Sequence, residues 1–505
     1  MSAEPAIRPF SRAYRWTFAF CTLLTLVPLW AFDFLPMVDL PQHAAQVSIW
    51  RHWHDPAYGY PELFTVNWWT PYLLAYFLAY LLSWLMPVKA AFTVVVSVAI
   101  LAVPLVVRLL LRETGGHPWW VFICFPVGFS YAFYWGFVNY MLAVPLALGF
   151  ILLAARFAGR PSLRRALGLA FFAHLLFVAH AVVFGFCGLV AGLMVVLRAP
   201  GWRAALLRLV PLASALPLAA VWLAHLRSSE ATTRDPANWN LGFDRAGELP
   251  SLALGMRWED EAVVASILLA AVPLFVGGRP ARAAWRWAPL AVTLGLYFLA
   301  PLEILGTAFL YPRFAVFVLP AWLFALDDRA PAAVPAHRLV LAPALAAAWL
   351  VSLPFRFHGF NQEVGPFQEV IAQIPPHQRV LYQGFDHGSA RVSYYPVFLH
   401  FGCWYQVERG GMVDFSFVEF FPAWFRYRPQ ARARLPQNFS WRPAVFDARK
   451  HRGELYGFFL ARSLGPIDKP PGTLTVHRGD WWVHRPPIPA RRHRARGAGF
   501  RNRPG

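Results

Sequence analysis

The chain has 505 residues, of which 58% are hydrophobic and only 14% are charged. A soluble globular chain carries roughly a quarter charged residues, so this composition excludes an ordinary soluble protein and predicts a polytopic α-helical membrane protein. The formal net charge of +20 comes from arginines in short loops and near the end of the chain. That pattern is typical of membrane topology rather than of nucleic-acid binding.

The first apolar segment, residues 14–31, follows Arg8 and Arg12 and has no small-residue cleavage site. It predicts an uncleaved anchor with the N-terminus in the cytoplasm. Directly after it, the stretch 37–43 places an acid, Asp39, at the membrane surface.

Pro41 suits the first turn of a helix, because its missing N–H would have no partner there. We therefore expect a helix from Pro41 to about His54 that lies in the interface, where tryptophans are favoured. Asp39 then has His43 as its i+4 neighbour, and both are candidate catalytic residues. The alternative is that the helix dipole alone favours an acid at this position and that the pair is merely solvated.

Apolar runs long enough to cross a membrane follow along the chain. A span needs roughly 20 residues. The runs lie near 15–32, 89–111, 118–134, 137–157, 166–197, 204–226, 260–277, 285–303, 310–327 and 336–354.

Two stretches, 70–86 and 166–197, leave the number of spans open, and we use the charges of the loops to choose between the alternatives. If 70–86 is an interfacial or re-entrant helix and 166–197 is two short helices turning near His180, the arginine-rich loops all fall inside. This interpretation predicts about eleven spans in the inner (cytoplasmic) membrane, with the C-terminus outside.

After Leu353 the composition becomes that of a soluble domain, with a short helix at 367–374. Strands are expected at 379–382 and 456–460 and a closing hairpin at 473–483. We therefore predict three parts. They are a membrane domain with an outer loop at 33–88, a small extracytoplasmic α/β domain, and a disordered basic tail, covering residues 1–354, 355–484 and 485–505.

Glu303 and Arg313 flank the outer turn between two spans. An ionisable group at membrane depth is a functional candidate. Arg313 offers a planar fork to a phosphate. Alternatively, it forms an ion pair with Glu303 or extends its charge to the lipid headgroups.

Three further polar features are weaker candidates. Asn139 lies at the outer end of a span, and His180 lies on the broken segment. Arg257 belongs to the polar loop 227–259, which is either ordered over a site or a solvated connector. Each of these side chains also fits a packing or surface role.

Metal and nucleotide chemistry have no sequence motif. The four cysteines form neither a disulfide framework nor a metal-binding pair, and the alternating His52 and His54 point to different faces of a helix. His387 and His400 have no recognisable partner in the sequence. Walker, dinucleotide-binding, nucleophile-elbow and HExxH motifs are absent from the sequence.

The order of these parts resembles that of the GT-C glycosyltransferases, polytopic enzymes that use polyprenyl-phosphate-linked sugars. The shared features are one span, an outer loop that begins with an acid, an apolar helix opened by Thr70-Pro71, a run of spans and an extracytoplasmic C-terminal domain. The family acid is usually one of an acidic pair, whereas Asp39 stands alone.

The resemblance implies that Asp39 is a general base or helps to bind a divalent cation. It also implies that the arginine of Tyr311-Pro-Arg-Phe314 holds the lipid phosphate of a polyprenyl-phosphate-sugar donor. The acceptor would be a glycan, lipid or protein, and in-line attack would invert the anomeric carbon. A transporter or flippase of a lipid-linked sugar and a non-catalytic envelope assembly subunit are the alternatives.

Overall fold

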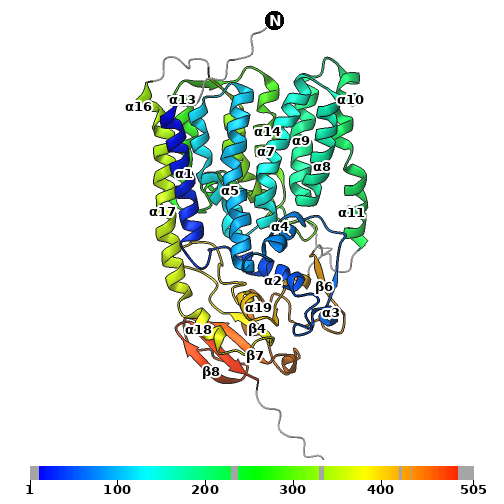
Figure 1. Cartoon of the computed structure of the whole chain (residues 1–505), viewed down its shortest axis with the longest axis vertical. Helices are drawn as coiled ribbons and strands as arrows, with labels where there is room; N and C mark the ends of the chain where they lie inside the picture. The colour runs from blue at the N-terminus through cyan, green and yellow to red at the C-terminus, as the bar shows by residue number, and fades with distance from the viewer. Residues whose placement is uncertain (1–10, 229–236, 329–334, 420–422, 434, 487–505) are drawn as a thin grey trace, which may run out of the picture.

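The computed structural model describes residues 11–228, 237–328, 335–419, 423–433 and 435–486. The predicted basic tail therefore lies outside the described residues from position 487 onward. Long helices stand side by side in an upright bundle, and a small mixed sheet closes one end of it (Figure 1).

Six long helices form the body of the bundle, and they are apolar over most of their surface, as expected of helices buried in protein or lipid. They are α1 (Arg12–Trp30), α5 (Val88–Thr114), α7 (Val138–Gly159), α8 (Leu163–Ala179), α9 (Ala181–Arg198) and α17 (Leu341–Val364). The shorter helices around them are α10 (Trp202–Ala213), α11 (Leu216–Ser228), α12 (Asp244–Ala253), α13 (Asp260–Phe275), α14 (Ala288–Leu299), α15 (Val318–Phe324) and α16 (Ala336–Leu339).

The chain is a multi-pass membrane protein. Four described helices are long and apolar enough to cross a membrane, namely Val88–Thr114, Val138–Gly159, Ala181–Arg198 and His337–Ala372. The pair Trp202–Ala213 and Leu216–Arg227, bent by 55°, would make a fifth. The predicted number of about eleven spans is not confirmed.

Fewer helices than expected are long enough to span, because several apolar runs fold into short helical pieces, some of which begin with a proline. The run 118–134 folds into three short pieces, η1 (Pro118–Cys124), η2 (Pro126–Phe129) and α6 (Tyr131–Trp135). A proline opens each of the first two pieces, and proline cannot donate the backbone hydrogen bond of a longer helix. Likewise, the run 310–327 divides into η4 (Tyr311–Phe317) and α15.

The helices around the Asp39 segment have bounds close to those expected, and α2 is buried in protein along most of its length. Helix α2 covers Leu40–Arg51 with Pro41 in its first turn, and α4 (Leu74–Leu82) occupies the ambiguous stretch 70–86. The break at His180 is confirmed, because this residue is extended (φ −168°, ψ 112°) between α8 and α9. Between α2 and α4 lie α3 (Tyr60–Leu63) and β1 (Phe64–Val66).

The C-terminal region contains the predicted strands and hairpin. Its sheet has the order β5-β4-β7-β9-β8, in which β4 is parallel to β5 and β7 while β9 is antiparallel to both of its neighbours. The elements are α18 (Phe367–Ala372), β4 (Arg379–Gly384), α19 (Cys403–Arg409), β5 (Met412–Asp414), β6 (Phe425–Tyr427), β7 (Phe458–Arg462), β8 (Thr473–Arg478) and β9 (Trp481–Arg485). Short connections add η3 (Ala284–Trp287), η5 (Phe417–Glu419), η6 (Pro443–Val445), η7 (Gly453–Leu455) and the paired strands β2 (Gly278–Pro280) and β3 (Leu326–Asp328).

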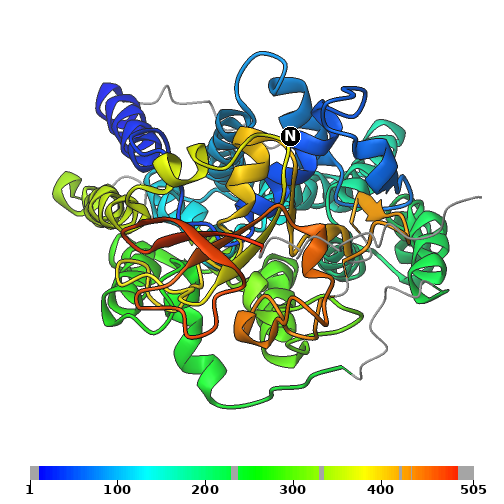
Figure 2. The same ribbon diagram turned by 90° about the horizontal axis from the view of Figure 1, so that it is seen from below.

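The C-terminal region packs continuously against the bundle, and its strands lie across the end of the helices (Figure 2). Helix α17 runs ten residues past the expected boundary at 354, to Val364. Strand β1 pairs antiparallel with β6. One cluster of buried apolar side chains extends from Tyr14 in α1 to Val483 in β9.

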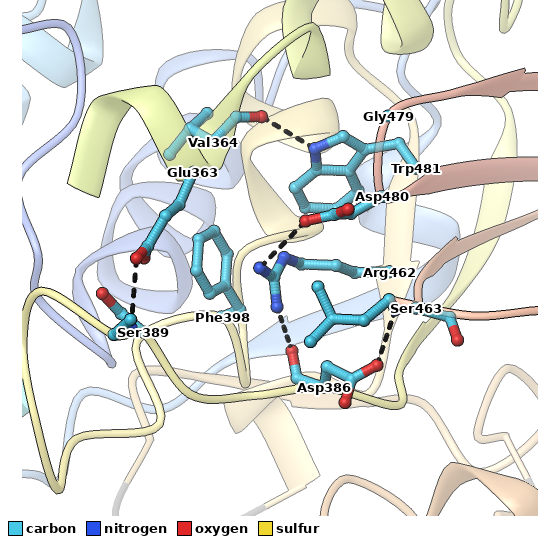
Figure 3. A network of polar contacts seen from close by, with 12 residues as sticks. Glu363, Val364, Asp386, Ser389, Phe398, Arg462, Ser463, Gly479, Asp480 and Trp481 are labelled. Atoms are coloured by element: carbon cyan, nitrogen blue, oxygen red, sulfur yellow. Dashed lines mark hydrogen bonds and ion pairs between the residues drawn. The ribbon is translucent and has the colours of Figure 1, made fainter. Parts of the chain in front are cut away.

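A buried arginine at the end of β7 joins two loops of the C-terminal region (Figure 3). The Arg462 guanidinium donates to the Asp386 carbonyl at 2.5 Å and to Asp480 Oδ2 at 3.3 Å. Nearby, Trp481 Nε1 donates to the Val364 carbonyl at 2.8 Å, which joins β9 to the last turn of α17. The sheet is therefore held in a defined position over the end of the bundle.

Candidate active site

A cavity of about 620 Å³ lies where the bundle meets the C-terminal region. Three parts of the chain line it, namely the Asp39 segment with α4, the bundle helices, and the C-terminal residues between 399 and 441. Five of the six site residues expected from the sequence are among its lining residues: Asp39, His43, Asn139, Glu303 and Arg313.

Asp39 is placed by its backbone. Its N–H donates to the Trp135 carbonyl at 3.0 Å, and it is the N-cap of α2 without a side-chain capping bond. Gly136 makes this approach possible, because it has φ +78° and an added Cβ would lie 2.8 Å from the Asp39 nitrogen. Because its side chain caps no helix, the Asp39 carboxylate remains available to the cavity.

A histidine from the C-terminal region lies next to Asp39. His400 Nε2 lies 3.7 Å from Asp39 Oδ1. Burial raises the pKa of Asp39 to about 8, an effect that the positive charge of Arg313 partly opposes. Burial also lowers the pKa of His400 to about 3. At neutral pH the site therefore holds a mostly protonated carboxyl group beside a neutral imidazole.

His43 has another partner than the expected one. Its Nδ1 lies 2.6 Å from the Tyr76 hydroxyl, to which Gln46 Nε2 also donates at 3.1 Å. Burial lowers the pKa of His43 to about 4. His43 thus enters the cavity wall as a neutral ring bound to α4, and the imidazole closest to Asp39 is His400 instead.

Arg313 is held by backbone carbonyls and an aromatic ring. Its Nε donates to the Phe309 carbonyl at 3.2 Å and its Nη2 to the Ala308 carbonyl at 2.9 Å. The guanidinium carbon lies 3.7 Å above the Phe137 ring. Among the described residues no carboxylate lies within 4.0 Å of this guanidinium, so the alternative of a Glu303 ion pair is not seen there. A fixed, half-buried cation of this kind is suited to an anionic ligand.

Glu303 lines the cavity, and its backbone carbonyl accepts the Asn238 N–H at 2.9 Å. Arg257, in contrast, does not line it. Its Nη2 lies 2.6 Å from Oε1 of the buried Glu248, whose other oxygen accepts from the Tyr311 hydroxyl at 3.2 Å. Part of the polar loop 227–259 is thus the ordered helix α12. The bond between Tyr311 and Glu248 joins this helix to η4, and Arg257 pairs with the same glutamate.

Several lining residues had no signal in the sequence. His400 stands in an unremarkable polar stretch, and Trp441 and Tyr76 belong to regions rich in aromatic residues. For His180 the sequence signal was its position in the apolar run 166–197, which is too long for one crossing and was expected to turn near this residue. Across the described residues no three His, Cys, Asp or Glu side chains gather in a way that could hold a metal ion.

No family model matches the sequence, and no curated protein matches it either. Solved structures do match. Arabinofuranosyltransferase AftD from Mycobacteria aligns over 92% of this chain with 16% identity and a TM-score of 0.48, and this chain spans only 36% of that protein. ArnT from Cupriavidus metallidurans, bound to undecaprenyl phosphate, aligns over 94% of this chain and 98% of its own, with 11% identity and a TM-score of 0.51. By this likeness the chain has a GT-C-like fold over nearly its whole length.

Proposed function

We propose that this protein is an inverting membrane glycosyltransferase. It moves a sugar from a polyprenyl-phosphate donor to a glycan, lipid or protein acceptor at the extracytoplasmic face of the inner membrane. The observation that carries the proposal is the shared cavity, in which the Asp39 carboxyl group and the Arg313 guanidinium both face one space. The GT-C-like fold supports the reaction class, and the lipid bound to ArnT supports the donor class.

Asp39 suits activation of the acceptor in a glycosyl transfer, and Arg313 suits stabilisation of the leaving group. Ionised Asp39 takes the proton of the acceptor hydroxyl while the acceptor oxygen attacks the anomeric carbon. The bond from that carbon to the phosphate oxygen breaks, and its electron pair leaves with the lipid phosphate. Arg313 offsets the charge that develops on this leaving group. Attack opposite the leaving phosphate inverts the configuration of the sugar.

The charge distribution supports the proposed orientation. Helices α5, α7 and α9 all end at the pole opposite the sheet (Figure 1). There Arg156 pairs with Glu113 at 2.7 Å, Arg198 donates to the Ala155 carbonyl at 2.9 Å and Arg208 donates to the Ala158 carbonyl at 3.1 Å. Arginine-rich turns favour the cytoplasmic side, so the cavity and the C-terminal region would face outward.

The test is native mass spectrometry of the detergent-purified full chain with added undecaprenyl phosphate. We expect the wild-type protein to retain one lipid and Arg313→Ala to lose it. Arg156→Ala is the matched control, because it removes an arginine at the far pole and should bind as the wild type does. If the wild type carries only bulk phospholipid, the proposed donor is wrong.

A further inference from the structure

Of the described residues that line the cavity, four carry a buried polar atom without a hydrogen-bond partner: Gln46 Oε1, Asn139 Oδ1, His180 Nδ1 and Trp424 Nε1. Two of these atoms, Asn139 Oδ1 and His180 Nδ1, belong to the bundle wall, on side chains that are 8% and 4% exposed. Buried polar groups in folded proteins are nearly always hydrogen bonded. Two unpaired atoms on one wall therefore call for a ligand that completes them.

The fold holds the His180 ring in place. His180 is the N-cap of α9, yet its side chain makes no capping bond. The Tyr72 ring lies 4.6 Å away on edge, and the Tyr140 ring lies 5.1 Å away on edge. Because aromatic contacts confine the imidazole, it has little freedom to turn Nδ1 toward another protein atom.

The same tyrosine connects both atoms with Arg313. Tyr140 follows Asn139 in α7, and its hydroxyl donates to the Arg313 carbonyl at 2.7 Å. The Arg313 guanidinium carbon lies 5.8 Å from the Tyr140 ring centre. Asn139, His180 and Arg313 therefore surround one part of the cavity. The first N–H groups of α9 begin beside it, and a helix N-terminus favours an anion.

We infer that this cluster is the binding site for the polar head of the donor. His180, with its proton on Nδ1, donates to an oxygen of the same phosphate that Arg313 neutralises. Asn139 accepts a hydrogen bond from a hydroxyl group of the attached sugar. This inference rests on the proposed function, because the ligand that it names is the lipid-phosphate sugar.

The first experiment measures thermal unfolding of the full chain in detergent, titrated with undecaprenyl phosphate. Without lipid, His180→Phe should melt at or above the wild-type temperature, because an unpaired buried polar atom has been removed. With lipid, its Kd should be at least about tenfold weaker, the usual effect of losing a hydrogen bond to a charged group. His180→Asn restores an N–H near the position of Nδ1 and should recover part of the affinity.

The control is His174→Phe, which changes an exposed histidine on the preceding helix, α8. If lipid stabilises the wild type but not Arg313→Ala, and His180→Phe binds like the wild type, the His180 inference is overturned while the proposed function stands. If the wild type is not stabilised at all, the proposed function itself fails.

The Asn139 assignment has its own experiment with a panel of undecaprenyl-phosphate hexoses and pentoses. In the wild type at least one sugar-linked lipid should bind more tightly than undecaprenyl phosphate. Asn139→Leu should abolish that gain and leave the binding of undecaprenyl phosphate unchanged. The assignment is overturned if the sugar-linked lipid still binds more tightly than undecaprenyl phosphate in Asn139→Leu. It is also overturned if no sugar-linked lipid binds more tightly in the wild type.

Discussion

The two walls of the cavity differ in how they place their polar groups. The bundle wall carries Arg313, Asn139 and His180 among apolar side chains, each fixed by its own helix or turn. The C-terminal wall brings His400 beside Asp39, at 3.7 Å, where α19 packs on α2. Asp39, the expected reactive acid, therefore lies where the two walls meet, and its environment depends on both of them.

The largest expected effect is that of Asp39→Asn, which keeps the shape of the side chain and removes the base. A positioned general base typically contributes about 10²–10⁴ in rate, so we expect sugar transfer to fall by that factor in membranes supplied with donor lipid. Asp33→Asn, an exposed acid on the same loop, is the control and should be unaffected. Near wild-type transfer by Asp39→Asn would contradict the role of this residue.

The pH dependence of the transfer rate tests the electrostatic environment of Asp39 between the two walls. Since burial raises the pKa of Asp39 to about 8 and only its ionised form is a base, the rate should increase with pH and level off above about 8. Below that point the slope should be close to tenfold per pH unit. The other titratable or charged groups that line the cavity are His43, Tyr72, Tyr76, Tyr140, His180, Glu303, Arg313 and His400. A flat rate profile between pH 6 and about 9 would exclude Asp39 as the titrating base.

His400→Phe isolates the contribution of the C-terminal wall. The His400 ring already packs against the Phe415 and Phe417 rings, so a phenyl ring fits its surroundings. Replacing the polar imidazole 3.7 Å from Asp39 Oδ1 by an apolar ring makes the surroundings of ionised Asp39 less polar and should move the inflection of the pH–rate profile upward by about one unit. His358→Phe, at an exposed site on α17, should leave the profile unchanged. An unchanged inflection in His400→Phe would show that the bundle alone sets the pKa of Asp39.

The smallest expected effect concerns the connection between the walls. Gln42 on α2 donates to the Phe415 carbonyl at 2.9 Å and accepts from the Phe417 N–H at 3.0 Å. Gln42→Leu leaves both backbone groups without this partner and should destabilise the contact by about 1–3 kcal/mol. Hydrogen exchange of residues 415–419 should become faster. The control is Gln362→Leu, which changes an exposed glutamine. If residues 415–419 exchange at the same rate in Gln42→Leu as in this control, the C-terminal wall is held by apolar packing alone.

Local patterns in the sequence were sufficient for much of the fold. Pro41 predicted the start of α2, and an apolar run too long for one crossing predicted the break at His180. Alternating apolar residues predicted β4 and the hairpin of β8 and β9. Each of these features depends on residues close together in the chain. The number of spans was harder to predict, because short helical pieces with Pro118, Pro126 or Pro312 in their first turn occupy apolar runs that hydropathy alone counts as single helices.

For the candidate site, the sequence by itself singled out Asp39 by its place directly after the first apolar segment. It singled out Arg313 because a charge at membrane depth is costly. It could not tell that Arg257 pairs with Glu248, nor that His43 turns to Tyr76. Only the tertiary structure decided that His400 lies beside Asp39 and that Asn139 and His180 face the same space as Arg313. Those contacts join segments far apart in the chain, and no local periodicity or motif records which distant side chains will meet.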